Sequence, residues 1–153
     1  MDLIIWRHAD AQEEQPGQDD LQRALTPRGE KQAARMAKWL DLHLPDNARI
    51  LCSPALRCEQ TLQPLGRKYK LQQELAPDGL PDDLLKAAGW PEARQAVLVV
   101  GHQPMLGQVI AKLMGFKADN CPIRKGSVWW LRSRERDGHQ QTVLIAVRSP
   151  DVL

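Results

Sequence analysis

The chain has 153 residues, of which 42% are hydrophobic and 26% are charged; this is the composition of a globular protein, not of a disordered or fibrous one. Its 21 basic side chains nearly balance 19 acidic ones, which argues against a general nucleic-acid-binding domain. Arginine outnumbers lysine by 13 to 8, a bias that favours planar, bidentate recognition of phosphate or carboxylate groups.

The first half of the chain alternates apolar runs with helical patterns. Thr26 before Pro27 is a favourable start for a helix, and Pro45 marks its end. In chain order we predict a strand over 3–6, a loop over 11–22, a helix over 27–44, a strand over 48–52, and a helix that begins at Ser53-Pro54 and carries Leu65.

The second half continues the alternation and then changes character. The continuous β-branched run 96–100, stopped by Gly101, predicts the clearest strand of the chain. In chain order we predict a weak strand over 69–75, a short helix over 81–88, this strand, a helix over 104–114, and a hairpin whose strands 127–131 and 142–147 flank a polar loop around Asp137-Gly138.

These elements predict an α/β fold with three layers, in which helices cover a mainly parallel central sheet and the C-terminal hairpin adds antiparallel strands. A chain of this length predicts one domain over residues 1–153. Ligands of such sheets bind beyond the carboxyl ends of the strands. Three strands deliver polar residues to that edge: Arg7-His8, Ser53 with Arg57 in the following helix, and His102.

Two histidines and two arginines at one sheet edge predict an electropositive pocket. Arg7 and Arg57 offer bidentate hydrogen bonds that suit a phosphate dianion. Their charges favour a neutral imidazole nearby, and a neutral ring nitrogen is a nucleophile. His8 is therefore the candidate to attack phosphorus, with Arg7, Arg57 and His102 stabilising charge on the phosphoryl oxygens.

Four segments resemble the histidine phosphatase (phosphoglycerate mutase-like) superfamily, in the order that the family has them. They are Arg7-His8-Ala9, the stretch Leu25–Ala33 (LTPRGEKQA), the stretch Ser53–Thr61 (SPALRCEQT) and Gly101-His102-Gln103-Pro104. Together they span about two-thirds of the chain. The short length, the Arg23-x-Leu25-Thr26 spacing and Glu74-Leu75-x-Pro77 resemble the SixA-type phosphohistidine phosphatases within this superfamily.

The resemblance implies that His8 is the phosphorylated nucleophile and that Arg7, Arg57 and His102 form the phosphate pocket. It makes Arg23 an additional phosphate or substrate contact, although an ordinary surface role in a polar loop is as compatible with the sequence. It implies no metal and no organic cofactor. The sequence departs from the family at Ala9, where glycine is usual, and a methyl group there disfavours positive φ and close backbone approach.

The expected partner is a phosphohistidine-containing protein, such as a histidine-phosphotransfer domain or a related phosphocarrier in signal transduction. A chain this short leaves little room for a lid, so the pocket is expected to open to a macromolecular surface. An imidazole leaving group accepts a proton near neutral pH, which reduces the need for a strong acid. The candidate proton donors are Glu74 and Asp78, with Asp19 and Asp20 as weaker ones.

Three alternatives stay open on the sequence. In the first, the chain is a small-molecule phosphomonoesterase of the same superfamily. In the second, it is a phosphate- or phosphoprotein-binding module without turnover. The third is metal-dependent hydrolysis, because His8-Ala9-Asp10 has a metal-ligand spacing and His102 supplies a third ligand. Two arginines beside the site would repel a cation and disfavour this last alternative.

The cysteine pattern predicts a reducing compartment. The three cysteines are odd in number and have no paired spacing. The N-terminus lacks the pattern of a signal peptide, and no apolar run is long enough to span a bilayer. We therefore expect a cytoplasmic protein that binds neither membranes nor nucleic acid.

Overall fold

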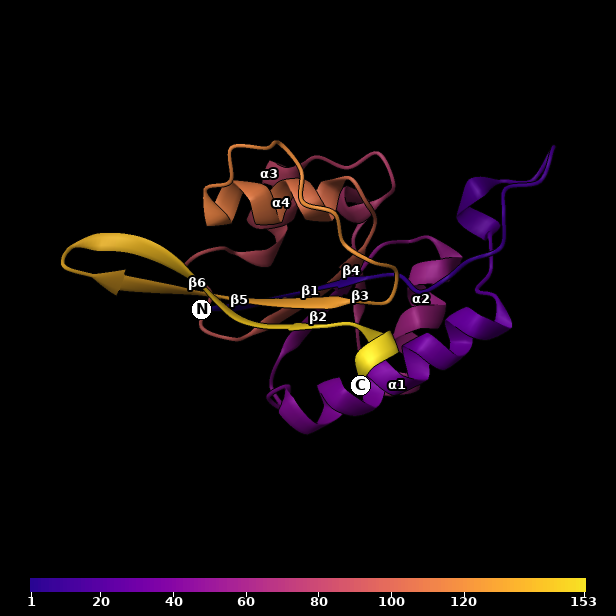
Figure 1. The fold of residues 1–153 in the computed structure, drawn as a ribbon, viewed down its shortest axis with the longest axis horizontal. Coiled ribbons are helices and arrows are strands. Elements are labelled where there is room, and N and C mark those ends of the chain that lie inside the picture. Colours follow the sequence, from indigo (N-terminus) through magenta and orange to yellow (C-terminus); the bar gives the residue numbers. More distant parts are fainter.

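A computed structural model describes residues 1–153 and contains one six-stranded sheet between two layers of helices (Figure 1). The sheet order is β3-β2-β4-β1-β5-β6. The four strands from β3 to β1 are parallel, whereas β5 and β6 pair antiparallel, so the predicted fold class is confirmed. The strands are β1 (Asp2–Arg7), β2 (Arg49–Cys52), β3 (Lys70–Leu71), β4 (Val97–Gly101), β5 (Val128–Arg136) and β6 (His139–Arg148).

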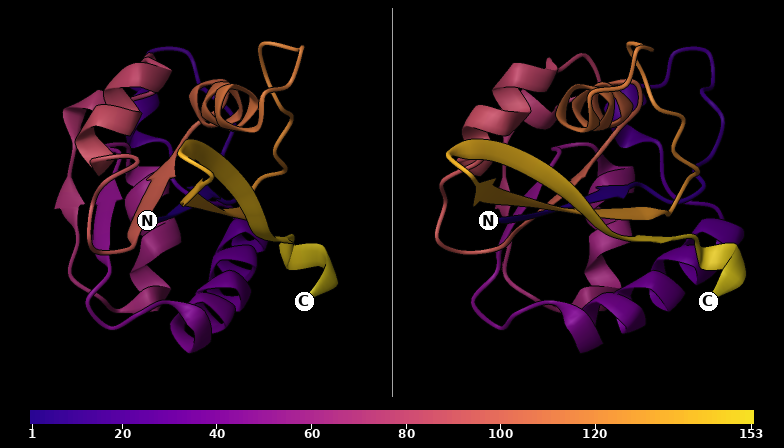
Figure 2. Two further views of the ribbon diagram at one scale, coloured as in Figure 1. Left: turned by 90° about the vertical axis from the view of Figure 1, so that its left-hand side faces the viewer. Right: turned by 60° about the vertical axis from the view of Figure 1, so that its left-hand side comes forward.

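Four α-helices cover the sheet, two on each face (Figures 1 and 2). One face carries α1 (Pro27–His43) and α2 (Leu56–Leu62), and the other carries α3 (Pro81–Ala88) and α4 (Met105–Met114). None of these helices has the length and apolarity that crossing a membrane requires. Short 3-10 turns complete the chain: η1 (Asp20–Gln22), η2 (Gln63–Leu65), η3 (Gln73–Leu75) and η4 (Pro150–Val152).

Strand β1 lies at the centre of the core and is buried on both faces. Leu3 and Ile5 pack on the side of α3 and α4, whereas Ile4 and Trp6 pack on the side of α1 and α2. All four side chains are 0% exposed. Strands buried on both faces need apolar residues at every position, which explains the uninterrupted apolar run seen in the sequence.

The helix starts show one confirmed prediction and one error. Helix α1 begins at Pro27 as predicted, because the Thr26 hydroxyl accepts a hydrogen bond from the Gly29 N–H at 3.0 Å. Helix α2 begins at Leu56 and not at Ser53-Pro54. The Ser53 hydroxyl accepts from the Ala55 N–H at 3.2 Å, which holds this stretch in a turn before the helix.

The C-terminal hairpin is longer than predicted. The expected polar loop is mostly paired strand, and only Asp137 and Gly138 form the turn, with φ angles of 53° and 77°. A two-residue turn with positive φ at both positions matches the twist of the strands that it joins. Another difference is β3, where the weak strand expected over 69–75 is reduced to two residues before η3.

The close packing of α1 against the chain after His8 gives a test of the fold. A methyl group on Gly29 would overlap the backbone carbonyl oxygen of Asp10, which already accepts a hydrogen bond from the Thr26 N–H. We expect Gly29→Ala to lower the free energy of unfolding by about 1–3 kcal/mol, as overpacking does, measured by urea denaturation. Glu30→Ala changes the exposed neighbouring position and should stay within about 0.5 kcal/mol of wild type. Equal stability of the two variants would contradict the close contact.

Candidate active site

The polar residues that follow three strands meet at one edge of the sheet. In the parallel pairing, Arg7 of β1 lies beside Gly101 of β4, and Cys52 of β2 lies beside Val100. The residues immediately after these positions are His8, His102 and Ser53. The imidazole rings of His8 and His102 have centroids only 5.3 Å apart.

His8 is held as a neutral imidazole with one nitrogen committed. It is 7% exposed, and its Nδ1–H donates to the backbone carbonyl of Ala9 at 2.8 Å. Burial lowers the pKa of His8 from its ordinary value of 6.5 to about 4, and the positive charges of Arg57 and Arg7 act in the same direction. At neutral pH the proton therefore sits on Nδ1, and Nε2 carries the lone pair.

His102 is the more deeply buried of the two histidines, with 2% exposure. Its Nε2 lies 2.8 Å from the Ser53 hydroxyl and 3.4 Å from the Cys58 sulfur, while its Nδ1 is buried and has no partner within the protein. Burial lowers the pKa of His102 to about 3, and the nearby His8 and Arg57 add to the shift. Both imidazoles are thus neutral at pH 7.

The two predicted phosphate-binding arginines are each fixed at one edge of the guanidinium group. Arg7 donates through Nη1 to the backbone carbonyl of Ile123 at 2.6 Å. Arg57, which is 3% exposed, donates through Nη1 to the backbone carbonyl of Asp20 at 2.8 Å. The Nε atoms of both arginines are buried without a hydrogen-bond partner in the protein, like Nδ1 of His102. Buried donors need an acceptor, and a tetrahedral anion offers several acceptor oxygens at once.

Arg23 is joined to this group through the carboxylate of Asp20. Arg23 donates from Nε to Asp20 Oδ1 at 2.9 Å and from Nη1 to the carbonyl of Gln12 at 2.7 Å. The other oxygen of the same carboxylate lies 3.0 Å from Nη2 of Arg57. The structure therefore brings Arg7, His8, Arg57 and His102 together, with Arg23 linked to them at the rim.

Comparison with known sequences identifies relatives of this chain. The sequence family described as the histidine phosphatase superfamily (branch 1) matches residues 3–78. Phosphohistidine phosphatase SixA of Escherichia coli (strain K12) is 34% identical over 122 residues, which cover 74% of each chain. The chain belongs to the histidine phosphatase superfamily. A SixA homolog of Haemophilus influenzae is 29% identical and covers 98% of this chain and 97% of its own.

Solved structures of histidine phosphatases share the architecture. The protein histidine phosphatase SixA complexed with tungstate superposes with a TM-score of 0.78 at 27% identity, over 99% of each chain. A phosphoserine phosphatase mutant from Entamoeba histolytica superposes with a TM-score of 0.73 over 99% of this chain and 98% of its own. That second likeness, at 17% identity, is a likeness of fold alone.

The role of the two predicted proton donors of this histidine phosphatase stays a prediction. Glu74 lies on η3 and Asp78 in the turn before α3; both are exposed, and neither forms a hydrogen bond or ion pair with a pocket residue. Asp20, the weaker candidate, does contact the pocket. Burial alone would raise its pKa, but the hydrogen bonds and charges of Arg23 and Arg57 outweigh that effect and keep the pKa below its ordinary value. Asp20 is therefore an ionised acceptor at neutral pH and not a proton donor.

The sequence placed Ser53 at this edge and named Asp20 as a weaker proton donor, but it did not reveal the contacts that these two residues make. Ser53 closes its own turn and contacts His102, and no spacing rule connects two residues 49 positions apart. Asp20 lies 37 positions from Arg57, and the local signal that was present was its place three residues before Arg23, the spacing of an ion pair on a helical turn.

Ala9, the departure from the family pattern, fits without strain. Asp137 is the one non-glycine residue with positive φ, so Ala9 has an ordinary backbone conformation. Its methyl group is 0% exposed and packs with Leu25 and Ala33. Its N–H donates to the Thr61 hydroxyl at 2.9 Å. Alanine at this position contributes to packing beneath the site.

Asp10, a ligand in the metal-binding alternative, has its carboxylate engaged by other residues. The Asp10 carboxylate accepts from the Thr26 hydroxyl at 2.7 Å and pairs with Lys125 at 3.2 Å. No group of three or more His, Cys, Asp or Glu side chains lies in a metal-binding arrangement. Asp10 instead ties the chain after His8 to the start of α1.

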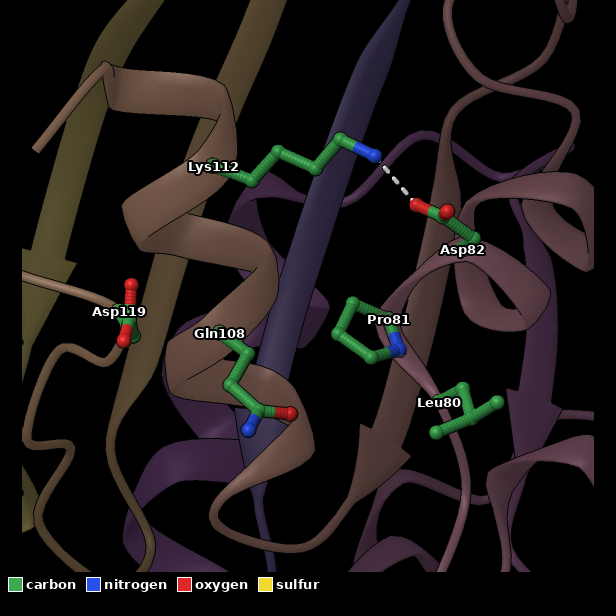
Figure 3. Close-up of a pocket in the computed structure, with 6 residues that line it drawn as sticks. All are labelled: Leu80, Pro81, Asp82, Gln108, Lys112 and Asp119. Carbon is green, nitrogen blue, oxygen red and sulfur yellow. Dashed lines mark hydrogen bonds and ion pairs between the residues drawn. The ribbon is translucent and has the colours of Figure 1, made fainter.

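Another cavity, of about 440 Å³, lies between α3 and α4 (Figure 3). None of the predicted site residues lines it. The close-up shows the ammonium group of Lys112 directed at the carboxylate of Asp82 across its mouth, so these two charges compensate each other. Its lining consists of Leu80, Pro81, Asp82, Gln108, Lys112 and Asp119.

The two neutral imidazoles make stability depend on pH in a defined window. The folded protein keeps His8 and His102 neutral down to about pH 4 and pH 3, whereas an unfolded chain protonates histidine near pH 6.5. Between pH 6.5 and 4 the unfolded state therefore binds more protons, and the free energy of unfolding should fall as the pH is lowered. Urea denaturation across this range measures the slope. The double variant His8→Asn/His102→Asn should have a clearly shallower slope, and an unchanged slope would contradict the assignment.

Proposed function

We propose that this protein is a phosphohistidine phosphatase that acts through a covalent phosphohistidine intermediate on His8. One observation carries the proposal: a neutral His8 with a free Nε2 lies beside three buried nitrogen atoms, of Arg7, Arg57 and His102, that have no partner within the protein. A nucleophile and a set of phosphate ligands at one sheet edge are what phosphoryl transfer to histidine requires. We propose that residues 1–153 form a single domain that carries the whole activity.

The reaction proceeds in two displacements at phosphorus. In the first, the lone pair on Nε2 of His8 forms a bond to phosphorus, the bond to the leaving nitrogen breaks, and that nitrogen keeps the electron pair and takes up a proton from the solvent. In the second, water attacks phosphorus, the bond to Nε2 breaks, and orthophosphate leaves with the proton of water released to the solvent. Arg7 and Arg57 stabilise the charge on the three equatorial oxygens in both steps. His8 supplies the nucleophile, Arg7 and Arg57 stabilise the charge, and the solvent supplies water and protons. We therefore propose that the reaction needs no metal.

Ser53 sets the tautomer of His102 in this scheme. The Ser53 oxygen accepts the N–H of Ala55 and lies 2.8 Å from Nε2 of His102, and we assign the Ser53 hydroxyl as the donor in this second hydrogen bond. A neutral His102 that accepts at Nε2 carries its proton on Nδ1, the buried nitrogen without a partner. His102 thereby acts as a hydrogen-bond donor to a phosphoryl oxygen without adding a charge.

A phosphohistidine side chain on a phosphotransfer or signalling protein is the substrate that we favour. The curated relative from Escherichia coli is described as a phosphohistidine phosphatase. The Asp20 carboxylate beside Arg57 is ionised and has no proton to give, and an imidazole leaving group needs a proton donor less than an alkoxide does. Transfer to His8 exchanges one phosphorus–nitrogen bond for another. The three cysteines are free and buried, which suits a reaction in the cytoplasm.

A small-molecule phosphomonoesterase is the second candidate, and one observation favours it. The same fold occurs in a structure described as a phosphoserine phosphatase mutant in complex with phosphoserine. A phosphate-binding module without turnover would need Arg7 and Arg57 but not His8.

Replacement of the nucleophile separates turnover from binding. We expect His8→Ala to lose the acid-labile, alkali-stable phosphoryl label and to lower turnover by about 10³-fold or more, because the covalent step is removed. Binding of inorganic phosphate, measured by calorimetry, should persist because Arg7, Arg57 and His102 remain. His139→Ala changes an exposed histidine on the hairpin and should behave like wild type. Label that survives in His8→Ala would refute the mechanism.

Substrate choice is tested by direct competition. We expect release of phosphate from a phosphorylated histidine-phosphotransfer domain to exceed release from an aryl phosphate in kcat/KM, because a protonated imidazole leaves without acid catalysis. Both rates are measured with the same enzyme stock, with and without EDTA. A preference for the aryl phosphate would move the small-molecule alternative to the front, and loss of activity in EDTA would contradict metal independence.

A further inference from the structure

Asp20 holds two arginines from different parts of the chain with three acceptor atoms. Its carboxylate accepts from Nε of Arg23 at 2.9 Å and from Nη2 of Arg57 at 3.0 Å. Its backbone carbonyl accepts from Nη1 of Arg57 at 2.8 Å. Arg57 comes from α2, whereas Asp20 and Arg23 belong to the segment around η1, so Asp20 is the link between these two parts of the site.

Asp20 takes two of the five N–H donors of Arg57 and leaves the N–H on Nε and one on each terminal nitrogen for another acceptor. Both terminal nitrogens of Arg57 are engaged, and Nε is buried without a partner. Arg7 is held at one terminal nitrogen only, since Ile123 accepts from its Nη1, and its Nε is likewise without a partner. For Arg57, the two contacts with Asp20 fix the plane of the guanidinium group. A planar donor held in this way loses little further freedom when an anion binds.

Charge gives a second reason for a carboxylate at this point. Arg57 is 3% exposed, so its charge has little water around it. Arg23 lies at the other oxygen of the same carboxylate, and the two guanidinium groups repel each other. An ionised Asp20 between them makes the close placement possible, whereas a neutral side chain would leave the repulsion uncompensated.

We propose that Asp20 is the positioning residue of the phosphate pocket: it orients Arg57 and ties Arg23 to it, so that both arginines face the phosphoryl group during transfer. This inference rests on the proposed function at the same pocket. It also gives the loop that carries η1 a role, because Asp19 caps η1 by accepting from the Leu21 N–H at 3.1 Å and so fixes the turn that presents Asp20.

Substitution of Asp20 tests this role, and the matched control removes a carboxylate that contacts neither arginine. We expect Asp20→Ala to weaken binding of inorganic phosphate and of tungstate about tenfold or more, to raise KM and to lower kcat, because charge-assisted bonds to both arginines are lost. Asp20→Asn should fall between wild type and Asp20→Ala, because an amide oxygen still accepts one hydrogen bond. Asp46→Asn removes a carboxylate at an exposed position between α1 and β2, away from both arginines, and should stay within about twofold of wild type.

A double variant shows whether the effect passes through Arg57. In an Arg57→Lys background, Asp20→Asn should add little to the loss of tungstate affinity, whereas two independent sites would give additive losses. Unchanged affinity in both single Asp20 variants would overturn the proposal. Tighter binding would also overturn it, by identifying Asp20 as an anion that competes with phosphate. Absence of turnover in the wild-type protein would refute the proposed function and leave this comparison of affinities valid.

Discussion

The parallel pairing of β4 with β1 on one side and with β2 on the other is the constraint on which the site depends. The register places Arg7 beside Gly101 and Cys52 beside Val100, so three strands end together. Buried apolar residues on both faces lock this register, because a slip by one residue would turn each side chain to the opposite face. The packing of the core therefore sets the relative positions of the residues that follow these strands.

The residues that the sequence identified lie at the end of a strand or directly after it, except Arg57, which lies in the helix that follows β2. His8 and His102 come immediately after abrupt ends of apolar runs, and such ends are local signals. The contacts that it missed join distant segments. Ser53 was expected to start a helix and instead closes a turn beside His102. Glu74 and Asp78 were chosen from their place in the chain, and their role as proton donors stays a prediction. No periodicity encodes where a carboxylate on a loop points.

Burial and charge act together on the two histidines. Exclusion of water is the larger influence on both, and the guanidinium groups add to it, so the imidazoles are neutral although they are ordinary histidines by sequence. The excess of arginine acquires a specific meaning at Arg7 and Arg57, whose backbone-anchored guanidinium groups occupy the low-dielectric edge of the sheet. Exposed pairs such as Arg124 with Asp151 contribute little by comparison.

The long hairpin extends away from the site and carries none of the residues proposed to act there. Because β5 runs antiparallel to β1, the Asp137-Gly138 turn lies beyond the amino end of β1, across the sheet from His8 (Figure 1). Its strands pair with each other there and carry mostly exposed side chains. A solvent-facing turn of this kind tolerates inserted sequence. It is the natural attachment point for a fluorophore, an affinity peptide or a surface tether that leaves the opposite edge, which carries His8, unobstructed.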